Sequence, residues 1–354
     1  MILLIFNFFL LLVSFYLLAR ICDAYFVESL DKIAHKLKMS SDMAGATLMA
    51  VGSSAPELFV AIIALLKPGN HGDIGTGTIV GSALFNILVI VGASAVAIKK
   101  TILSWQPVVR DTIFYSFSII VLIMAFRDGR IDFIEALMFV GLYIIYLVAV
   151  AKWRKILPYK DVDKMIEGVG KEMKKSEKKK WHKITRPLDW TLDKFFPAAK
   201  HYYLIFFISI AFIVALSWVL VESAISISHT LGIPEAIIAL TVLAAGTSIP
   251  DLISSIIVAK QGRGEMAISN AIGSNIFDIL FGLGVPWLIL LSFSNKDIFV
   301  STENLLTSVI LLFATVVIVF FLLLVRKWRI GHRAGYFLIA LYILYLIWAI
   351  SRVM

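Results

Sequence analysis

Ten stretches of mostly apolar residues, each long enough to cross a lipid bilayer as a helix, recur along the 354 residues of this chain. The lipid interior offers the backbone no hydrogen-bond partner, so a spanning segment must satisfy its own polar groups, as a helix does. Hydrophobic residues make up 60% of the chain and charged residues only 16%, which is typical of a membrane protein. The stretches lie at about residues 1–20, 42–66, 73–98, 108–126, 131–152, 201–225, 235–260, 265–291, 302–325 and 334–352. We therefore predict an all-α integral membrane protein with ten transmembrane helices, the first an uncleaved span rather than a signal peptide.

A basic segment divides the chain into two halves. Residues 151–200 contain 15 Lys and Arg against 7 Asp and Glu, and positive residues collect on the cytoplasmic side of membrane proteins. This pattern predicts an N-terminal five-span half (1–153), a cytoplasmic loop (154–200) and a C-terminal five-span half (201–354). Both termini then lie outside, most simply at the plasma membrane. Because the net charge of +9 is concentrated in one loop, it does not indicate nucleic-acid binding.

A shorter amphipathic segment follows the first span. Between Phe26 and Leu37, apolar residues recur at helical spacing opposite several lysines. This pattern predicts a helix that lies on the inner leaflet of the bilayer.

The second apolar stretch is repeated in the seventh. Residues 47–63 align without gaps on residues 241–257, and eight of the 17 positions are identical. The match resumes between residues 79–86 and residues 271–278. Five spans, an odd number, separate the copies, so the two copies must run in opposite directions. Two inverted five-helix repeats are typical of secondary transporters, whose binding site lies where the repeats meet.

Both copies carry a glycine followed four residues later by a proline, Gly52 with Pro56 and Gly246 with Pro250. Proline has no backbone N–H and clashes with the carbonyl four residues earlier, and glycine tolerates the distortion. We therefore predict a helix break in each copy, which frees backbone carbonyls near the bilayer midplane. Such carbonyls are costly unless they line a cavity or meet an ion.

One acidic residue follows each predicted break, Glu57 in the first copy and Asp251 in the second. A carboxylate in the middle of a span is expensive and indicates a functional site. The alternative, a structural ion pair, needs a basic residue at the same depth. The sequence places Lys and Arg only at the ends of these spans.

Other oxygen-bearing side chains share helix faces with these acids, at spacings of three or four residues. They are Ser53, Ser54, Ser82, Asn86, Ser274 and Asp278. Carboxylate, hydroxyl, amide and carbonyl oxygens are the ligands that calcium prefers, and sodium accepts the same set. Soft metals would require Cys or His, which these spans lack at depth.

The charge of this predicted site suggests a second cation. Glu57, Asp251 and Asp278 together carry about −3 when ionised, so one calcium ion leaves about −1. Either a monovalent cation beside calcium or a proton on one carboxyl would balance that charge.

At these residues the chain resembles the cation/calcium exchanger superfamily, through residues 52–59 and 246–251, which are similar to its two alpha-repeat signatures. Residues 273–278 are similar to the potassium-dependent sodium/calcium exchangers. The resemblance implies the sodium/calcium exchanger fold. It implies a calcium site formed by Glu57, Asp251, Ser53, Thr247 and the backbone carbonyls of Ala50 and Ala244. It implies sodium sites formed by Ser53, Ser54, Ser82, Asn86, Thr247, Ser248, Ser274 and Asp278. It places a potassium position at Asp278 and Asn275.

The predicted function is therefore exchange of sodium for calcium by alternating access, with or without potassium, and with spans 1 and 6 as a moving gate. The principal alternative is a calcium/proton antiporter on the same fold. A channel and a membrane enzyme are further alternatives, but the spans contain no catalytic set of side chains. The expected partners are calcium, sodium and the lipid bilayer, with no cofactor and no nucleic acid, and the chain is expected to act as a monomer.

Overall fold

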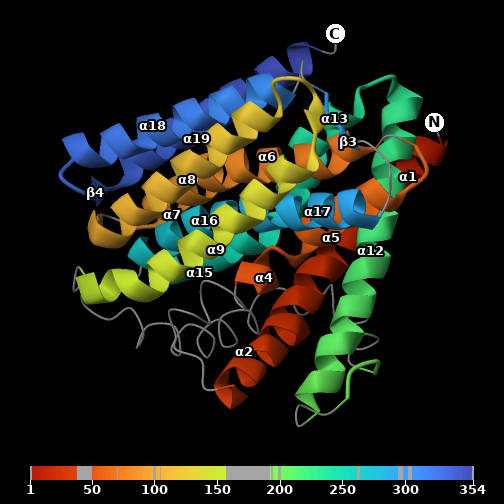
Figure 1. Ribbon diagram of the computed structural model, residues 1–354, viewed down its shortest axis with the longest axis horizontal. Coiled ribbons are helices and arrows are strands. Elements are labelled where there is room, and N and C mark those ends of the chain that lie inside the picture. The colour runs from red at the N-terminus through yellow and green to blue at the C-terminus, as the bar shows by residue number, and fades with distance from the viewer. Residues whose placement is uncertain are drawn as a thin grey trace.

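The computed structural model of the protein describes residues 2–37, 50–69, 71–98, 101–103, 105–156, 192, 194–197, 201–260, 264–293, 298–301 and 305–352. The beginning of the predicted second span and most of the predicted basic loop lie outside these residues. The described chain forms a bundle of long helices, and Figure 1 shows both chain ends on the side of the bundle that also carries α13 and β3.

Helices make up nearly all of the described chain. The α-helices are α1 (Ile2–Ile21), α2 (Val27–Lys36), α4 (Ala50–Ser53), α5 (Ala55–Leu66), α6 (Gly72–Phe85), α7 (Val91–Ala97), α8 (Trp105–Ala125), α9 (Phe133–Ile156), α12 (Tyr202–Leu231), α13 (Glu235–Ile238), α14 (Ala244–Thr247), α15 (Ile249–Lys260), α16 (Gly264–Phe277), α17 (Gly284–Phe293), α18 (Thr307–Val325) and α19 (His332–Ser351). Four π-helical turns join some of them: η1 (Cys22–Phe26), η3 (Asn86–Ile90), η4 (Ala239–Leu243) and η5 (Asp278–Leu283).

Eight continuous helical stretches of the described chain are long and apolar enough to cross a membrane, and three of them, Ile2–Leu30, Gly72–Ala97 and Ala267–Phe293, contain a π-helical turn that joins two α-helices. A ninth candidate is the broken pair Glu235–Thr247 and Ile249–Ile256, which bends by 40° at the break. α5 is a shorter apolar helix that follows α4. The prediction of a helical chain with many membrane-spanning segments is therefore confirmed, and the number ten stays a prediction.

Two pairs of very short strands link the two halves of the chain. β1 (Thr101–Ile102) pairs antiparallel with β4 (Arg329–Ile330), and β2 (Arg130–Ile131) pairs antiparallel with β3 (Ile298–Phe299). Each pair joins a turn of the first half to a turn of the second. Backbone hydrogen bonds thus hold the halves together at their connecting turns as well as through the packed helices.

α1 and α12 pack against each other as a pair at one side of the bundle (Figure 1). Inside this pair the side-chain amide of Asn7, which is buried, donates a hydrogen bond to the hydroxyl of Ser226 at 2.7 Å. α12 is tied to the end of α5 by an ion pair between Glu222 and Lys67, and the Lys67 ammonium lies 4.9 Å from the centre of the Trp218 ring. α1 and α12 are the helices of predicted spans 1 and 6.

The amphipathic segment after the first span forms helix α2, as predicted. Its apolar side includes Leu30, which is buried, and α2 packs against α12. The Lys36 ammonium lies 5.2 Å from the centre of the Tyr203 ring on α12. The apolar side of this helix is therefore covered at least in part by protein.

Asp111 of α8 is buried although it lies near the end of a predicted span, a position from which we expect an interfacial residue. Arg110 donates two hydrogen bonds to the Asp111 carboxylate, at 2.7 and 3.1 Å, and Tyr146 donates a third at 3.4 Å. A buried carboxylate needs such partners, and here one is its neighbour in the sequence and the other comes from α9.

One close helix crossing in the core involves α6, which packs against η4 and α14 through glycines. A Cβ atom added to Gly81 would lie 2.4 Å from the backbone oxygen of Leu240 and 2.6 Å from the Cβ of Ala244. A Cβ atom on Gly77 would lie 2.8 Å from the Cβ of Ala239. Small residues at these positions allow the two backbones to approach, as in other membrane helix pairs.

We expect Gly81→Ala to destabilise the protein by about 3 kcal/mol, because the added methyl group meets backbone atoms that cannot move aside. The measurement is the melting temperature of the purified protein in detergent. The matched control is Gly141→Ala on α9, where an added Cβ has no neighbour within 4 Å. Equal melting temperatures for the two variants would contradict the tight contact at Gly81.

Candidate cation site

Two helix breaks lie at the centre of the site. Ser54 separates α4 from α5 with a non-helical backbone (φ −97°, ψ 10°), and Pro56 stands in the first turn of α5. Ser248 separates α14 from α15 with nearly the same conformation (φ −90°, ψ 0°). The predicted breaks are therefore present in both copies, each just before the acidic residue.

Serine hydroxyls from the two halves of the chain pair across this centre. The Ser54 and Ser274 hydroxyl oxygens are 2.9 Å apart, and the Ser82 and Ser248 hydroxyl oxygens are 2.8 Å apart. In the sequence alignment of the copies, Ser54 corresponds to Ser248, and Ser82 corresponds to Ser274. The break in each copy therefore contacts a serine of the other copy, on α16 in one case and on α6 in the other.

The amide side chains lie next to these hydroxyls. Asn86 donates a hydrogen bond to the side-chain oxygen of Asn275 at 2.8 Å. The Asn275 amide donates to the Ala83 carbonyl at 3.1 Å and to the Tyr115 hydroxyl at 2.8 Å. The amide group of Asn275 is thus fully hydrogen-bonded within the protein, and it connects α16 to α6 and α8. Asn86 keeps a buried side-chain oxygen that has no hydrogen-bond partner among the described residues.

The carboxylates of Glu57 and Asp278 are buried almost completely, with 2% and 1% of each residue exposed. Ser248 donates a long hydrogen bond of 3.4 Å to one oxygen of Glu57. Within the described chain the other oxygen of Glu57 and both oxygens of Asp278 have no hydrogen-bond partner. Buried polar atoms are nearly always paired, so carboxylate oxygens without a protein partner indicate a cation as the group that they would bind.

Asp251 is partly exposed, unlike the other two acids. The negative charges of Asp251 and Glu57 repel each other, and each of them also repels the charge of Asp278. No Lys or Arg of the described segments forms an ion pair with any of the three. Among the described residues, the three acids therefore do not form the structural ion pairs that were the alternative explanation for them.

The acids do not form a closed ligand cluster in this conformation. No three His, Cys, Asp or Glu side chains of the described residues are close enough to hold a metal ion together. Full coordination would therefore need hydroxyl, amide and backbone oxygens as well, or a movement of the helices that carries the acids closer.

The remaining predicted ligands lie at the same breaks. Thr247 is buried, and its hydroxyl donates to the Leu243 carbonyl at 3.1 Å, which leaves its oxygen lone pairs available. The carbonyl of Ala244 accepts from the Ser248 backbone at 3.3 Å. Ser53 is partly buried and ends α4, and Ala50 begins it.

Tyr115 is the residue of this network that the sequence does not reveal. It lies on α8, is fully buried and holds Asn275 through its hydroxyl. A single tyrosine in an apolar span carries no motif. Its role depends on which face of α8 meets α16, and periodicity alone does not determine that.

Comparison with known proteins gives consistent matches over most of the chain. The family described as "Sodium/calcium exchanger protein" matches residues 7–152 and 201–351. Sodium/potassium/calcium exchanger 4 of Mus musculus is 29% identical over 96% of this chain and 80% of its own length. Sodium/potassium/calcium exchanger 2 of Gallus gallus is 30% identical over 94% of this chain and 75% of its own length.

Two solved structures share the fold. The sodium-calcium exchanger NCX_Mj matches with a TM-score of 0.58 and 22% identity, over 97% of this chain and 99% of that one. The H+/Ca2+ exchanger CAX matches with a TM-score of 0.71 and 17% identity, over 96% of this chain and 82% of that one. At these identities the two structures establish the architecture alone.

Proposed function

This chain belongs to the sodium/calcium exchanger protein family, and we propose that it exchanges sodium for calcium across a membrane by alternating access. Cation/calcium exchange is the activity named for its relatives, which are exchangers rather than enzymes. The observation that carries the proposal is the pair of buried carboxylates, Glu57 and Asp278, beside two helix breaks: one oxygen of Glu57 and both oxygens of Asp278 have no hydrogen-bond partner among the described residues. A desolvated cation is the group that such oxygens accommodate.

The proposed calcium ligands are Glu57 and Asp251, with Ser53, Thr247 and the carbonyls of Ala50 and Ala244. The proposed sodium ligands are Ser53, Ser54, Ser82, Asn86, Thr247, Ser248, Ser274 and Asp278. Calcium and sodium compete for this shared set of oxygens, and their different affinities for the inward- and outward-open states couple the two fluxes. The reciprocal serine pairs support this arrangement, because they bring both copies of the repeat to one centre.

We propose ten spans in two inverted repeats, with α4–α5 as span 2 and α13–α15 as span 7. The basic loop then faces the cytoplasm and both termini face outward, most simply at the plasma membrane. In this orientation the end of the bundle that carries Lys67, Gly72 and Glu235 is its outer end. The pair α1–α12 is the moving element, and the chain functions as a monomer.

Potassium co-transport is a further part of the proposal. Asp278 adds a third buried acid to Glu57 and Asp251, and a monovalent cation would balance its charge beside calcium. Asn275 lies next to it in the same helix region, but its amide is engaged by Asn86, Ala83 and Tyr115. Asn275 therefore contributes to the potassium position in one of two ways. Its hydrogen bonds fix α16 against α6 and α8, or the second lone pair of its side-chain oxygen binds the ion.

We expect that an outside-low, inside-high sodium gradient drives calcium into proteoliposomes at clamped pH, because sodium leaving through the site exchanges for calcium. The uptake should be several-fold above that of vesicles with equal sodium on both sides. The control is the same gradient imposed with choline. A calcium/proton antiporter is the second candidate, since the unpaired carboxyls could carry protons. Calcium uptake that follows a pH gradient without sodium, and ignores sodium, would overturn sodium exchange and favour that candidate.

A further inference from the structure

Tyr115 of α8 lies outside the two matching segments of the repeat and reaches the cation site through a single contact. Its side chain is fully buried, and its hydroxyl accepts a hydrogen bond of 2.8 Å from the Asn275 amide on α16. One turn earlier on α8, the Asp111 carboxylate accepts hydrogen bonds from Arg110 and from Tyr146 of α9. These contacts fix α8 beside the tyrosine, so the Tyr115 hydroxyl is an acceptor with a defined position.

The Asn275 amide is held by two acceptors from different helices. Its nitrogen donates one hydrogen to the Ala83 carbonyl at 3.1 Å and the other to Tyr115. A backbone carbonyl can only accept, so the Ala83 carbonyl fixes the direction in which the amide faces, and Tyr115 holds its second hydrogen. In the first copy of the repeat, Ala83 itself occupies the position of Asn275. The amide and its tyrosine therefore exist on one side of the site only.

Oxygens that are proposed to bind sodium lie next to this amide. Asn86 donates to the Asn275 oxygen at 2.8 Å and keeps its own side-chain oxygen without a partner in the described chain. Asp278 follows Asn275 by three residues on the same helix face, and neither of its oxygens has a described partner. The charge of Asp278 also acts on the Tyr115 hydroxyl. A hydrogen released from Tyr115 would therefore find free acceptors among the ligands of the ion.

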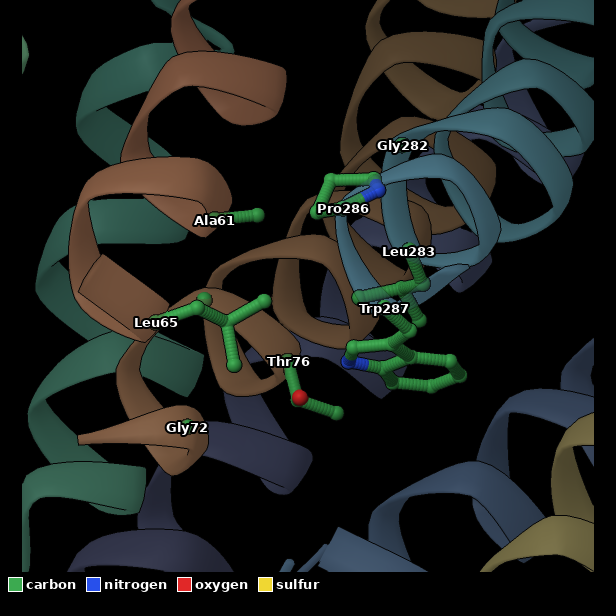
Figure 2. Close-up of a pocket in the computed structure, with 9 residues that line it drawn as sticks. Ala61, Leu65, Gly72, Thr76, Gly282, Leu283, Pro286 and Trp287 are labelled. Atoms are coloured by element: carbon green, nitrogen blue, oxygen red, sulfur yellow. The ribbon is translucent and has the colours of Figure 1, made fainter. Parts of the chain in front are cut away.

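The neighbouring cavity offers this hydrogen no other acceptor. It borders η5 at Gly282 and lies between α5, α6 and the η5–α17 segment. Figure 2 shows the side chains of Leu65, Thr76 and Trp287 projecting toward one another across it. The space is too narrow to hold a water molecule in this conformation. Water in this cavity therefore cannot replace Tyr115 as the acceptor.

We propose that Tyr115 is a positioning residue that sets the preference of the site for monovalent cations. It keeps the Asn275 donor away from the oxygens of Asn86 and Asp278, because a hydrogen-bond donor and a cation compete for the same lone pairs. The proposal rests on the proposed function and deepens it, since it names a residue that tunes the site for sodium without touching the ion. The proposed calcium ligands include neither Asn86 nor Asp278, so calcium binding should depend less on this contact.

The first test is Tyr115→Phe, which removes the hydroxyl and keeps the ring. A cation that binds the folded protein raises its melting temperature, so titration of the purified protein in detergent gives the affinities without transport. The sodium dissociation constant should rise about 3- to 10-fold, and the calcium constant should change by less than about 2-fold. The matched control is Tyr345→Phe on α19, which removes a buried hydroxyl that donates to Ser308 of α18 at 3.4 Å. Both constants should stay at their wild-type values in this control.

The second test asks whether Tyr115 acts through the amide. In an Asn275→Ala background the donor is absent, so adding Tyr115→Phe should change the sodium constant by less than about 2-fold. General damage to the packing of α8 would instead weaken sodium binding in both backgrounds. A full effect of Tyr115→Phe on top of Asn275→Ala would therefore overturn the proposed role.

The outcomes separate the role of Tyr115 from the exchange reaction. An unchanged sodium constant in Tyr115→Phe, in a protein whose calcium uptake is driven by sodium, would exclude this role and leave the proposed function intact. Sodium binding that weakens in Tyr115→Phe, although the wild-type protein shows no sodium-driven calcium uptake, would support the role and reject the exchange reaction. An equal loss of affinity for sodium and calcium would overturn Tyr115 as a determinant of the preference.

Discussion

Glu57→Gln is expected to lower calcium flux by at least about 100-fold, because the glutamine keeps the shape of the side chain and removes a charged ligand from a buried site. Losing one partner of a buried charged contact costs about 3–5 kcal/mol, and each 1.4 kcal/mol is a factor of ten in affinity. One oxygen of Glu57 accepts from Ser248, and the other has no partner among the described residues. The main interaction that the substitution removes is therefore the proposed contact between this carboxylate and the calcium ion. The measurement is calcium uptake into proteoliposomes under a sodium gradient.

The stability of this variant separates a lost ligand from a damaged fold. Without an ion, a buried charge with an unpaired oxygen destabilises the protein, so the melting temperature of Glu57→Gln in calcium-free detergent should equal or exceed that of the wild type. The matched control is Glu135→Gln on α9, whose carboxylate accepts from the Asp132 backbone and lies away from the site. Wild-type flux in Glu57→Gln would remove this residue from the calcium ligands.

Asp278→Asn is expected to abolish potassium stimulation of calcium flux while sodium/calcium exchange continues. The substitution removes one of three acids and makes position 278 equivalent to Asn86, its counterpart in the other copy. Calcium bound with two ionised carboxylates leaves no charge for a potassium ion to balance. The measurement is calcium flux under a fixed sodium gradient, with and without potassium.

The Asp278→Asn result can be interpreted only once the effect of potassium on the wild-type protein is known. If potassium does not stimulate the wild-type protein, the argument from three carboxylates to a monovalent partner is wrong, and a proton on one of them is the better account. The control is Asp128→Asn, a loop residue whose carboxylate accepts from the Arg130 backbone. Loss of all exchange in Asp278→Asn would instead show that the charge of Asp278 is required for sodium/calcium exchange itself and not only for the use of potassium.

Much of the site could be predicted because each of its parts is a local property of the chain. A proline four residues after a glycine disrupts the helix wherever the chain goes, and the structure interrupts both helices at Ser54 and Ser248. A carboxylate inside an apolar span is costly in any fold, so Glu57 could be identified without a structure. The internal repeat then indicated that residues near both breaks belong to one centre.

Contacts between helices could not be predicted, because they depend on which helix faces meet. Helical periodicity groups Ser82 with Asn86, but it does not pair Ser82 with Ser248 or assign Tyr115 to Asn275. The same limit applies to Asp111, whose buried carboxylate accepts a hydrogen bond from Tyr146 of α9.

The sequence by itself determined that this chain is a helical membrane protein with two related halves, each with a broken helix and an acid just after the break. These features follow from hydrophobic length, from the missing N–H of proline and from the cost of charge in lipid, none of which requires a partner. Only the tertiary structure decided that Ser54 meets Ser274, and that Glu57 and Asp278 have carboxylate oxygens without a hydrogen-bond partner among the described residues. Packing selects these contacts among many alternatives of similar composition, so they appear only when the helices are placed together.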